Sequence, residues 1–389
     1  MERSKGCLEK LDRMLKTLRH EEADRVPVSD FFWGGFLRRW IEELGLPDDT
    51  DIYDYYDLDW QCTTPNMDPH IKSFEILKEN DEEVLVRTGY EAVIRKKFAD
   101  PMPAFLSFSM DDIDQLEDFV FDDPWDDRRY FSGGDNQIAG VGDGFARNTP
   151  PWIDTVKEIY PKRPVFGSIC EGHEQVWRIV GSENVMMWIG LYPEKFGRFV
   201  ERVGDFLVEM TKAQIKAAGG MLDGMVIWGD VAYVNGMLFS PVYWRRWFKP
   251  IVEKMVQVCH EANIPVIYHG CGNATSLYED FIAMGMDCYN PLEARAGLDV
   301  VQLRQEYGHR MAFCGNMDVL EWAEAPMDEL KRIVMRKLNA AKGGGYIFQS
   351  DHSVPSNVSA ERYEFAINLV RKHGVYPLQL GEYDIPELG

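Results

Sequence analysis

The stretch IPVIYHGCGN, residues 264–273, runs an apolar, β-like segment directly into His269 and Cys271. Similar apolar runs recur along the chain and alternate with segments of helical period. They are RPVFGSICEG (163–172), DGMVIWGDVA (223–232), MDCYNPLE (286–293), HRMAFCGNMD (309–318), GGYIFQSDHSVP (344–355) and, near the N-terminus, DRVPVSDFF (24–32). Strands that alternate with helices predict parallel βα units. With NQIAGVGDG (136–144) as the candidate for an eighth strand, the pattern predicts an α/β fold, a closed (β/α)8 or TIM barrel.

Two segments depart from this βα rhythm. Residues 1–24 have a charged helical pattern and predict an N-terminal helical extension. Residues 73–98 alternate polar and apolar side chains around turn sites at Asn80 and Gly89, which predicts an inserted antiparallel β-meander. We expect this meander to cap one end of the barrel, and residues 1–389 to form a single domain.

The composition restricts the possible partners. The 389 residues carry a formal net charge of −22, so nucleic acid and anionic membranes would be repelled. No run of eighteen apolar residues and no apolar signal-peptide centre occurs, and we therefore expect a cytoplasmic protein. Dinucleotide-binding, P-loop and serine-hydrolase motifs are not found in the sequence. Small molecules and proteins remain as partners.

The predicted strands deliver polar side chains to one rim. In a (β/α)8 barrel the active site lies at the C-terminal ends of the strands. The residues at these ends are Asp30, Glu171 and His173, Asp230, His269 and Cys271, Glu293, Asn316 and Asp318, and Asp351 and His352. This convergence of ionisable and ligand-type side chains predicts a polar active site.

His269 and Cys271 are candidates for metal ligands. Residues two apart in a strand point the same way, so both side chains can face the mouth of the barrel. Zinc binds imidazole and thiolate, and a catalytic zinc usually has three protein ligands and an open position. The seven cysteines are an odd number and are expected to be reduced. His352 is the best placed third ligand, and the alternative is a core histidine beside a buried thiol.

Seven stretches are similar to members of the uroporphyrinogen decarboxylase superfamily, whose fold is a (β/α)8 barrel. They are LRHEEADRVPV (18–28), GSENVMMWIGLYPEKF (181–196), GDVAYVNGMLFSPVYWRRWFKP (229–250), HGCGN (269–273), NPLEARAGLDVVQLRQEYG (290–308), FCGNMD (313–318) and GGGYIFQSDHSVP (343–355). The resemblance covers almost the whole chain.

The resemblance favours one branch of this superfamily. Tetrapyrrole decarboxylases carry an arginine-rich stretch after the first strand, where this chain has SDFFWGGFLRR (29–39). The zinc-dependent corrinoid methyltransferases carry an H-x-C-G-N motif, which residues 269–273 match. Their third ligand is commonly a cysteine in a Gly-Cys-Gly-Ile-Pro-like loop, and alignment on Val354 and Pro355 puts His352 at that place.

The resemblance implies a Zn²⁺ site formed by His269, Cys271 and His352, and a corrinoid carried by a partner protein. A neutral histidine in place of the cysteine leaves zinc more electrophilic, which favours removal of a methyl group from a small methylated donor such as a methoxylated aromatic. Glu171 or Asp230 could act as the acid or as a fourth ligand. The predicted substrate-binding residues are Asp30, Phe31, Trp33, Trp228, Tyr233 and Asn316. The alternatives are a uroporphyrinogen-type decarboxylase, a methylcobamide:thiol methyltransferase and a non-catalytic binding protein.

Overall fold

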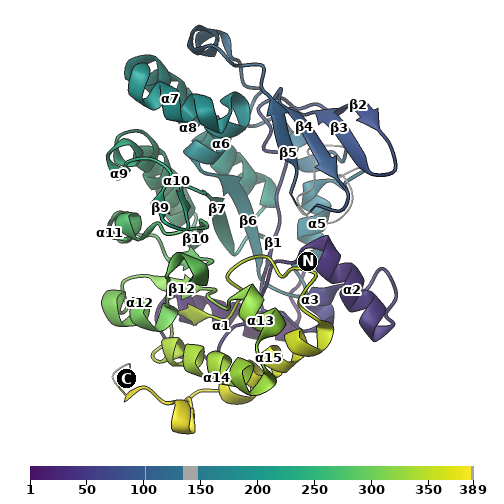
Figure 1. Ribbon diagram of the computed structural model, residues 1–389, viewed down its shortest axis with the longest axis vertical. Coiled ribbons are helices and arrows are strands. Elements are labelled where there is room, and N and C mark those ends of the chain that lie inside the picture. The colour runs from purple at the N-terminus through teal and green to yellow at the C-terminus, as the bar shows by residue number, and fades with distance from the viewer. Residues whose placement is uncertain (101, 135–147, 387–389) are drawn as a thin grey trace.

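A computed structural model describes residues 1–100, 102–134 and 148–386. The centre of the molecule is a seven-stranded parallel sheet. Figure 1 shows these strands in the middle of the molecule with helices around them. The spatial order is β1 (Gln61–Cys62), β6 (Val165–Cys170), β7 (Gly224–Trp228), β10 (Val266–His269), β11 (Cys288–Asn290), β12 (Ala312–Cys314) and β13 (Tyr346–Ile347). Neighbouring strands of this sheet also follow one another along the chain, as in a (β/α)8 barrel.

The N-terminal segment around Val28 closes the sheet into a barrel. Val28 forms a parallel bridge with Phe348, directly after β13. On its other side, the carbonyl of Val28 accepts a hydrogen bond from the Asp59 N–H at 2.8 Å, and the Ser29 hydroxyl donates to the carbonyl of Trp60 at 2.6 Å. The segment therefore lies between β13 and β1 and occupies the eighth strand position of the (β/α)8 barrel.

The interior of the barrel is filled by one small apolar cluster. Its members come from nearly every strand and from helix α1 (Lys5–Leu18): Met14, Leu18, Trp60, Phe166, Val226, Ile267, Cys288, Ala312, Cys314 and Ile347. Met14 and Leu18 share one face of α1, and the carbonyl of Thr17 accepts a hydrogen bond from the Gly345 N–H at 3.0 Å. The predicted N-terminal extension thus contains a helix that packs under the barrel.

A larger apolar cluster joins the sheet to the surrounding helices. The principal helices are α2 (Gly34–Leu44), α5 (Trp152–Ile159), α6 (Gly172–Val180), α7 (Ser182–Leu191), α8 (Pro193–Ala218), α10 (Lys249–Glu261), α11 (Tyr278–Ala283), α12 (Val300–Tyr307), α13 (Val319–Glu324), α14 (Met327–Lys337) and α15 (Ala360–His373). Short helices are α3 (Ile52–Tyr55), α4 (Arg128–Phe131) and α9 (Pro241–Tyr243). None of the helices within the described residues has the length and apolar character needed to span a bilayer.

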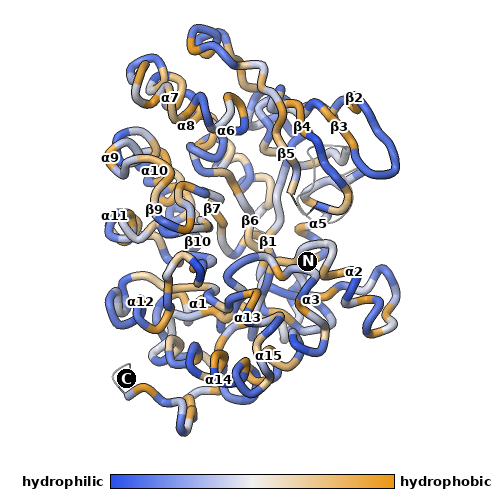
Figure 2. Tube along the Cα trace, viewed as in Figure 1, coloured by the Kyte–Doolittle hydropathy of each residue, from blue (hydrophilic) through white to orange (hydrophobic). Residues whose placement is uncertain are grey.

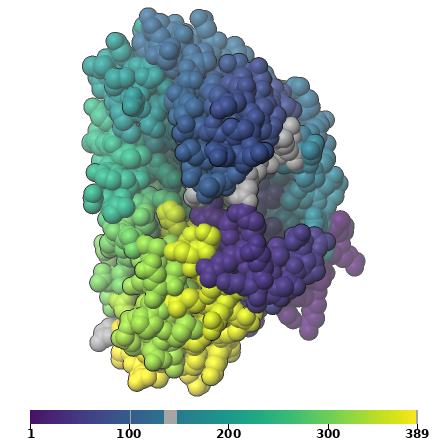
Figure 3. Space-filling view, turned by 45° about the vertical axis from the view of Figure 1, so that its right-hand side comes forward, coloured from purple at the N-terminus to yellow at the C-terminus, as the bar shows by residue number. Residues whose placement is uncertain are grey.

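An antiparallel meander lies at residues 73–98, and it continues beyond them into a further strand. It contains β2 (Glu75–Glu79), β3 (Glu83–Arg87), β4 (Val93–Lys97) and β5 (Ala104–Ser107), paired antiparallel in that order. Val84 and Val86 of β3 alternate with more exposed residues, which is why the sequence shows period two. Figure 2 shows hydrophilic residues along the connection between β2 and β3, and Figure 3 shows the meander, in blue, standing forward above the purple N-terminal part.

One strand of the sheet, β1, was not predicted from the sequence. The candidate for the eighth strand, 136–144, falls entirely within residues 135–147, which lie outside the described residues. The strand that precedes β6 in the sheet is instead β1, which has only two residues, Gln61 and Cys62. So short a strand has no detectable period in the sequence.

Candidate metal centre and substrate cavity

The alternation of side chains along the strands places His269 inside the mouth of the barrel. Ile267 belongs to the apolar cluster of the barrel interior, and His269 follows it by two residues. On the two neighbouring strands, Trp228 and Asn290 are each paired in register with His269. These three side chains form a polar and aromatic layer above the apolar interior.

Two glycines shape the loop that follows His269. A side chain at Gly270 would come within 2.8 Å of the Gly229 carbonyl oxygen. Gly272 has φ +78°, and a Cβ there would lie 2.6 Å from the backbone nitrogen of Tyr233. The carboxylate of Glu293 accepts a hydrogen bond from the Gly272 N–H at 2.8 Å. The loop is therefore held in one conformation, with Cys271 between the two glycines.

Cys271 lies between two imidazole rings. Its Sγ is 3.9 Å from Nε2 of His269 and 3.9 Å from Nε2 of His352, which comes from the loop after β13. The Asp351 carbonyl is 3.0 Å from Nδ1 of His352 and can only accept, so in the neutral form of the ring the hydrogen is on Nδ1. Nε2 of His352 is then left with a free lone pair beside the sulfur.

A carboxylate completes this group of ligand-type side chains. Ligand atoms of Asp230, His269 and Cys271 all lie within 4.8 Å of one another. One carboxylate oxygen of Asp230 also accepts a hydrogen bond from the Cys271 N–H at 2.8 Å. Asp230 is exposed, whereas His269 and Cys271 are half-buried.

The two sulfur–nitrogen distances fit a zinc ion, while His352 lies outside the group of ligand atoms that are all within 4.8 Å of one another. Bond lengths of about 2.3 Å to sulfur and 2.0–2.1 Å to nitrogen separate the two atoms by about 3.6 Å in a tetrahedral site, close to the observed 3.9 Å. Burial, followed by the charges of Asp230 and Glu293, raises the pKa of the Cys271 thiol well above its usual range. A dication would offset this accumulation of negative charge and favour the thiolate.

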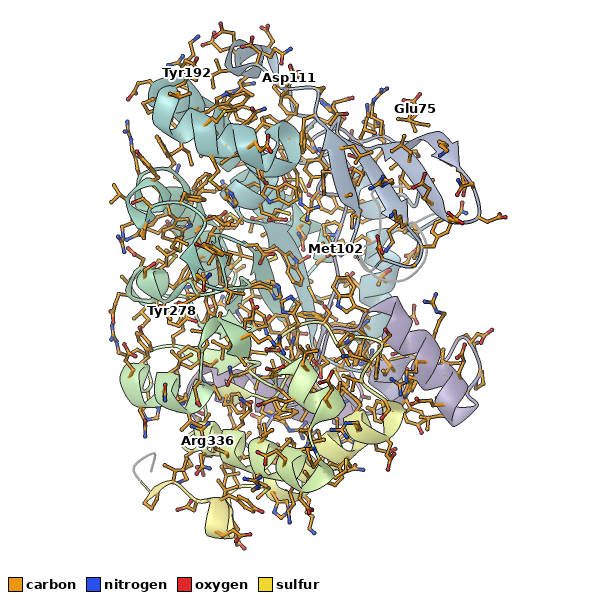
Figure 4. The ribbon with its side chains drawn as sticks, in the orientation of Figure 1. Glu75, Met102, Asp111, Tyr192, Tyr278 and Arg336 are labelled. Carbon is orange, nitrogen blue, oxygen red and sulfur yellow. The ribbon has the colours of Figure 1, made fainter. Side chains whose placement is uncertain are left out.

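A cavity of about 530 Å³ opens beside the candidate metal centre. Its lining combines residues of the barrel mouth with residues of the meander and includes Thr63, Asn66, Ile94, Met102, Phe105, Trp152, Glu174, Trp177, Arg178, Trp228, Asp230 and His269. Met102, labelled in Figure 4, marks the side formed by the meander. The expectation that the meander caps one end of the barrel agrees with this position.

Aromatic rings surround His269. The ring centroid of Trp228 lies 4.4 Å from that of His269, and the ring of Phe31 lies 6.0 Å from the same ring. Phe31 is also 5.4 Å from Trp228. The structure therefore brings two of the predicted substrate-binding residues to the candidate metal centre.

Three predicted site residues instead make hydrogen bonds within the protein frame. Asp30 is buried and accepts from the Ser350 N–H and hydroxyl and from the Tyr363 hydroxyl. Glu171 is buried, caps α6 by accepting from the His173 N–H at 2.5 Å, and accepts from the Trp244 indole at 3.0 Å. None of them is among the residues that line the cavity.

The third of these residues, Asn316, has a similar environment. Its amide oxygen accepts from the Val300 N–H at 3.0 Å and from Nζ of Lys337 at 2.7 Å. Its amide nitrogen donates to the carbonyls of Leu292 and Leu298, each at 2.8 Å. All the polar atoms of this side chain are thus engaged with neighbouring loops.

Trp33 and Tyr233 lie farther from the cavity lining. Trp33 is half-buried at the start of α2, and its N–H donates to the Val354 carbonyl at 3.1 Å. Tyr233 belongs to β8 (Ala232–Tyr233), which pairs with β9 (Gly236–Met237), and its side chain is exposed. Its carbonyl accepts from the Asn273 N–H at 3.0 Å, so it supports the loop of Cys271 through its backbone.

A polar group in the cavity wall was not predicted from the sequence. Glu174 and Arg178 are one helical turn apart on α6 and form an ion pair at 2.8 Å. The Trp177 indole also donates to Glu174 at 2.7 Å. Their spacing in the helix after the strand end at residue 170 is a signal that could have identified them.

The fold and the site define a (β/α)8-barrel protein with a polar cavity and a cluster of zinc-type ligands at the C-terminal ends of its strands. A model of the uroporphyrinogen decarboxylase (URO-D) family matches residues 154–373, more than half of the chain. The chain therefore belongs to the uroporphyrinogen decarboxylase family.

Curated relatives match part of the chain. A uroporphyrinogen decarboxylase of Thermus thermophilus is 26% identical over 182 residues, 45% of this chain and 48% of that protein. That of Myxococcus xanthus is 26% identical over 192 residues, 47% of this chain and 49% of that protein. The chain spans about half the length of the curated relatives it matches.

A solved structure matches nearly all of the chain. A methyltransferase from Methanosarcina mazei has a TM-score of 0.61 and 16% identity, and the match covers 93% of this chain and 98% of that one. At this identity the match establishes the barrel fold.

Proposed function

We propose that this chain is a zinc-dependent methyltransferase that moves a methyl group from a methoxylated aromatic donor to the corrinoid cobalt of a partner protein. The observation that carries the proposal is the position of Cys271, whose sulfur lies 3.9 Å from Nε2 of both His269 and His352 beside the cavity. Membership of the family and the fold shared with the Methanosarcina mazei methyltransferase support it.

The ligand-type residues divide into two roles. His269, Cys271 and His352 would hold zinc, which when bound supplies Lewis-acid polarisation of the donor oxygen. Asp230 is exposed at the cavity and can serve as a fourth ligand or deliver a proton to the leaving oxygen. We assign this role to Asp230 rather than Glu171, because both carboxylate oxygens of Glu171 accept hydrogen bonds from the protein frame.

The cavity wall suits a flat ring with a polar substituent. Trp228 offers aromatic surface in this wall next to His269, and Phe31 packs against Trp228 from outside the lining. The pair of Glu174 and Arg178 offers hydrogen-bonding groups in the same wall without a net charge. An aromatic ether would place its ring against Trp228 and its ring substituent near Glu174 and Arg178.

The proposed reaction is a transfer of CH₃⁺. The carbon–oxygen bond of the donor breaks with its electron pair going to oxygen, which then takes a proton. The new carbon–cobalt bond uses the electron pair of Co(I) in the corrinoid of the partner. Because the corrinoid must approach the methyl group at the cavity, the partner protein would dock at the mouth of the barrel.

Metal analysis together with a donor screen tests this proposal. Free cob(I)alamin is supplied as the methyl acceptor in place of the partner protein. Its absorption spectrum changes on conversion to methylcobalamin, so the transfer can be followed. We expect about one zinc per chain and a spectral change with a methoxylated aromatic, lost after chelation and restored by zinc. Methylamine donors form the comparison arm. Full activity of the metal-free protein would rule the proposal out.

Decarboxylation of a porphyrinogen is the second candidate, favoured by the names of the curated relatives. Among the described residues, the arginines of the cavity wall are already engaged: Arg129 donates to backbone carbonyls and Arg178 pairs with Glu174. These guanidinium groups therefore leave few hydrogen-bond donors for a substrate rich in carboxylates. Release of carbon dioxide from uroporphyrinogen without added metal would favour this candidate.

A further inference from the structure

Asn290 links the ring of His269 to the backbone of β12 through two hydrogen bonds. Asn290 ends β11, is paired in register with His269 and is 1% exposed. Its Oδ1 lies 2.5 Å from Nδ1 of His269, and its Nδ2 donates to the backbone carbonyl of Cys314 at 3.1 Å.

The partners in this chain fix each hydrogen. The carbonyl of Cys314 can only accept, so the amide group that faces it must be the NH₂ of Asn290. The amide oxygen then faces His269, where Nδ1 must carry the hydrogen that it accepts. In a neutral ring, Nε2 then keeps its lone pair. That nitrogen is the one 3.9 Å from the Cys271 sulfur.

This arrangement selects a tautomer that a histidine in water does not favour. A free imidazole side chain prefers its hydrogen on Nε2, which would direct an N–H toward the sulfur and leave no lone pair for a cation there. The amide also differs from a carboxylate, the other common partner of a ligating histidine, because it adds no negative charge. Cys271 would then supply the one formal charge of the His-Cys-His set.

We propose that Asn290 is a positioning residue that sets the tautomer of His269 for metal binding. This inference rests on the metal site of the proposed function and concerns binding of the metal alone. Asn290 acts through His269, in parallel with the Asp351 carbonyl, which sets the tautomer of His352. The two rings thereby direct both Nε2 atoms at one sulfur.

The first test measures zinc affinity by competition with a chromophoric chelator in the full chain. Asn290→Leu has a similar volume and no acceptor, and we expect zinc binding to weaken about 10–100-fold. Asn290→Asp keeps an oxygen toward Nδ1 of His269, and its second oxygen can carry a proton toward the Cys314 carbonyl. We expect that variant to bind zinc more tightly than Asn290→Leu.

Gln214→Leu is a matched control for the loss of a buried amide. Gln214 bridges α8 to β6 through hydrogen bonds to the Ser168 N–H and carbonyl at 3.0 and 2.9 Å. We expect this variant to lower stability while leaving the zinc affinity of the folded protein unchanged. An equal loss of zinc affinity in Gln214→Leu and Asn290→Leu would overturn the inference.

The second test observes the tautomer without metal. Histidine-selective ¹⁵N labelling, with His269 assigned by its absence in His269→Ala, distinguishes a protonated Nδ1 from a protonated Nε2. We expect Nδ1–H in the wild type and a shift toward Nε2–H in Asn290→Leu. A wild-type ring with Nε2–H overturns the inference, as does unchanged zinc affinity in Asn290→Leu. Zinc binding without methyl transfer would instead count against the proposed function alone.

Discussion

Two groups of polar side chains lie at the same rim of the barrel and differ in what they contact. Ligand atoms of Asp230, His269 and Cys271 lie within 4.8 Å of one another, the ring of His352 reaches the Cys271 sulfur, and Asp230 and His269 line the cavity. Asp30, Glu171 and Asn316 also follow strands, but their polar atoms bond to backbone groups and buried side chains. A position at a strand end therefore identifies the rim, and the partner of each side chain decides whether it is available for chemistry or holds the loops.

The largest difference between the groups should appear when a ligand is removed. We expect His269→Ala and Cys271→Ala to fold, to lose the bound zinc and to reduce methyl transfer to background, because two ligands bind zinc too weakly to retain it. Metal analysis and the cobalamin assay measure both effects. His373→Ala and Cys259→Ala, which alter a helix end and a buried helix position, are the controls and should retain both properties. Retention of zinc in both ligand variants would contradict the assignment.

Removal of Asp30 should have the opposite signature. Asp30→Ala leaves the Ser350 N–H and the Tyr363 hydroxyl without their acceptor, whereas the Ser350 hydroxyl keeps the His352 carbonyl. We expect the free energy of unfolding to fall by about 3 kcal/mol, since each unsatisfied buried group costs about 1–3 kcal/mol. Urea unfolding measures this change. Tyr363→Phe removes one of these donors and should cost about 1 kcal/mol.

A loss of zinc from folded Asp30→Ala without a loss of stability would place Asp30 with the ligands instead.

The pH dependence of the unfolding free energy should show whether Glu171 has a structural role or acts as a catalytic acid. Burial raises the pKa of Glu171 to about 7, above the usual 4.5, so the folded state holds a proton that the unfolded state releases. This contribution is complete below pH 4.5 and is lost as pH rises through 7, by up to about 3 kcal/mol. Glu171→Gln cannot ionise, so its unfolding free energy should fall less between about pH 5 and pH 8.

Urea unfolding at both pH values measures the difference between the two proteins. A variant with the pH slope of the wild type and no methyl-transfer activity would show that Glu171 acts in catalysis.

The smallest effect is expected from an exchange of ligand type. His352→Cys should retain zinc, because thiolate binds it as readily as imidazole. The added negative charge should make the metal less electrophilic and slow demethylation on the order of tenfold. Metal content and initial rates with the methoxylated donor check this outcome. A faster rate would favour the alternative in which a thiol accepts the methyl group.

Most of the barrel could be predicted from the sequence because its signals are local. The apolar runs that contain β6, β7, β10, β11, β12 and β13 each end in polar residues, and the meander shows period two. Strand β1 was missed because two residues carry no period. Segment 24–32 was identified as a strand, but its place between β13 and β1 depends on bridges that form when the barrel closes.

The spacing of His269 and Cys271 was enough to predict that the two side chains can face the same way, because residues two apart in a strand share a face. The folded barrel was needed to show that His352, 81 residues from Cys271, reaches the same sulfur. It was also needed to show that Asn290, on the adjacent strand, holds the ring of His269. Local periodicity sets the direction of a side chain, whereas its partner is set by the order in which the closed barrel brings its strands together.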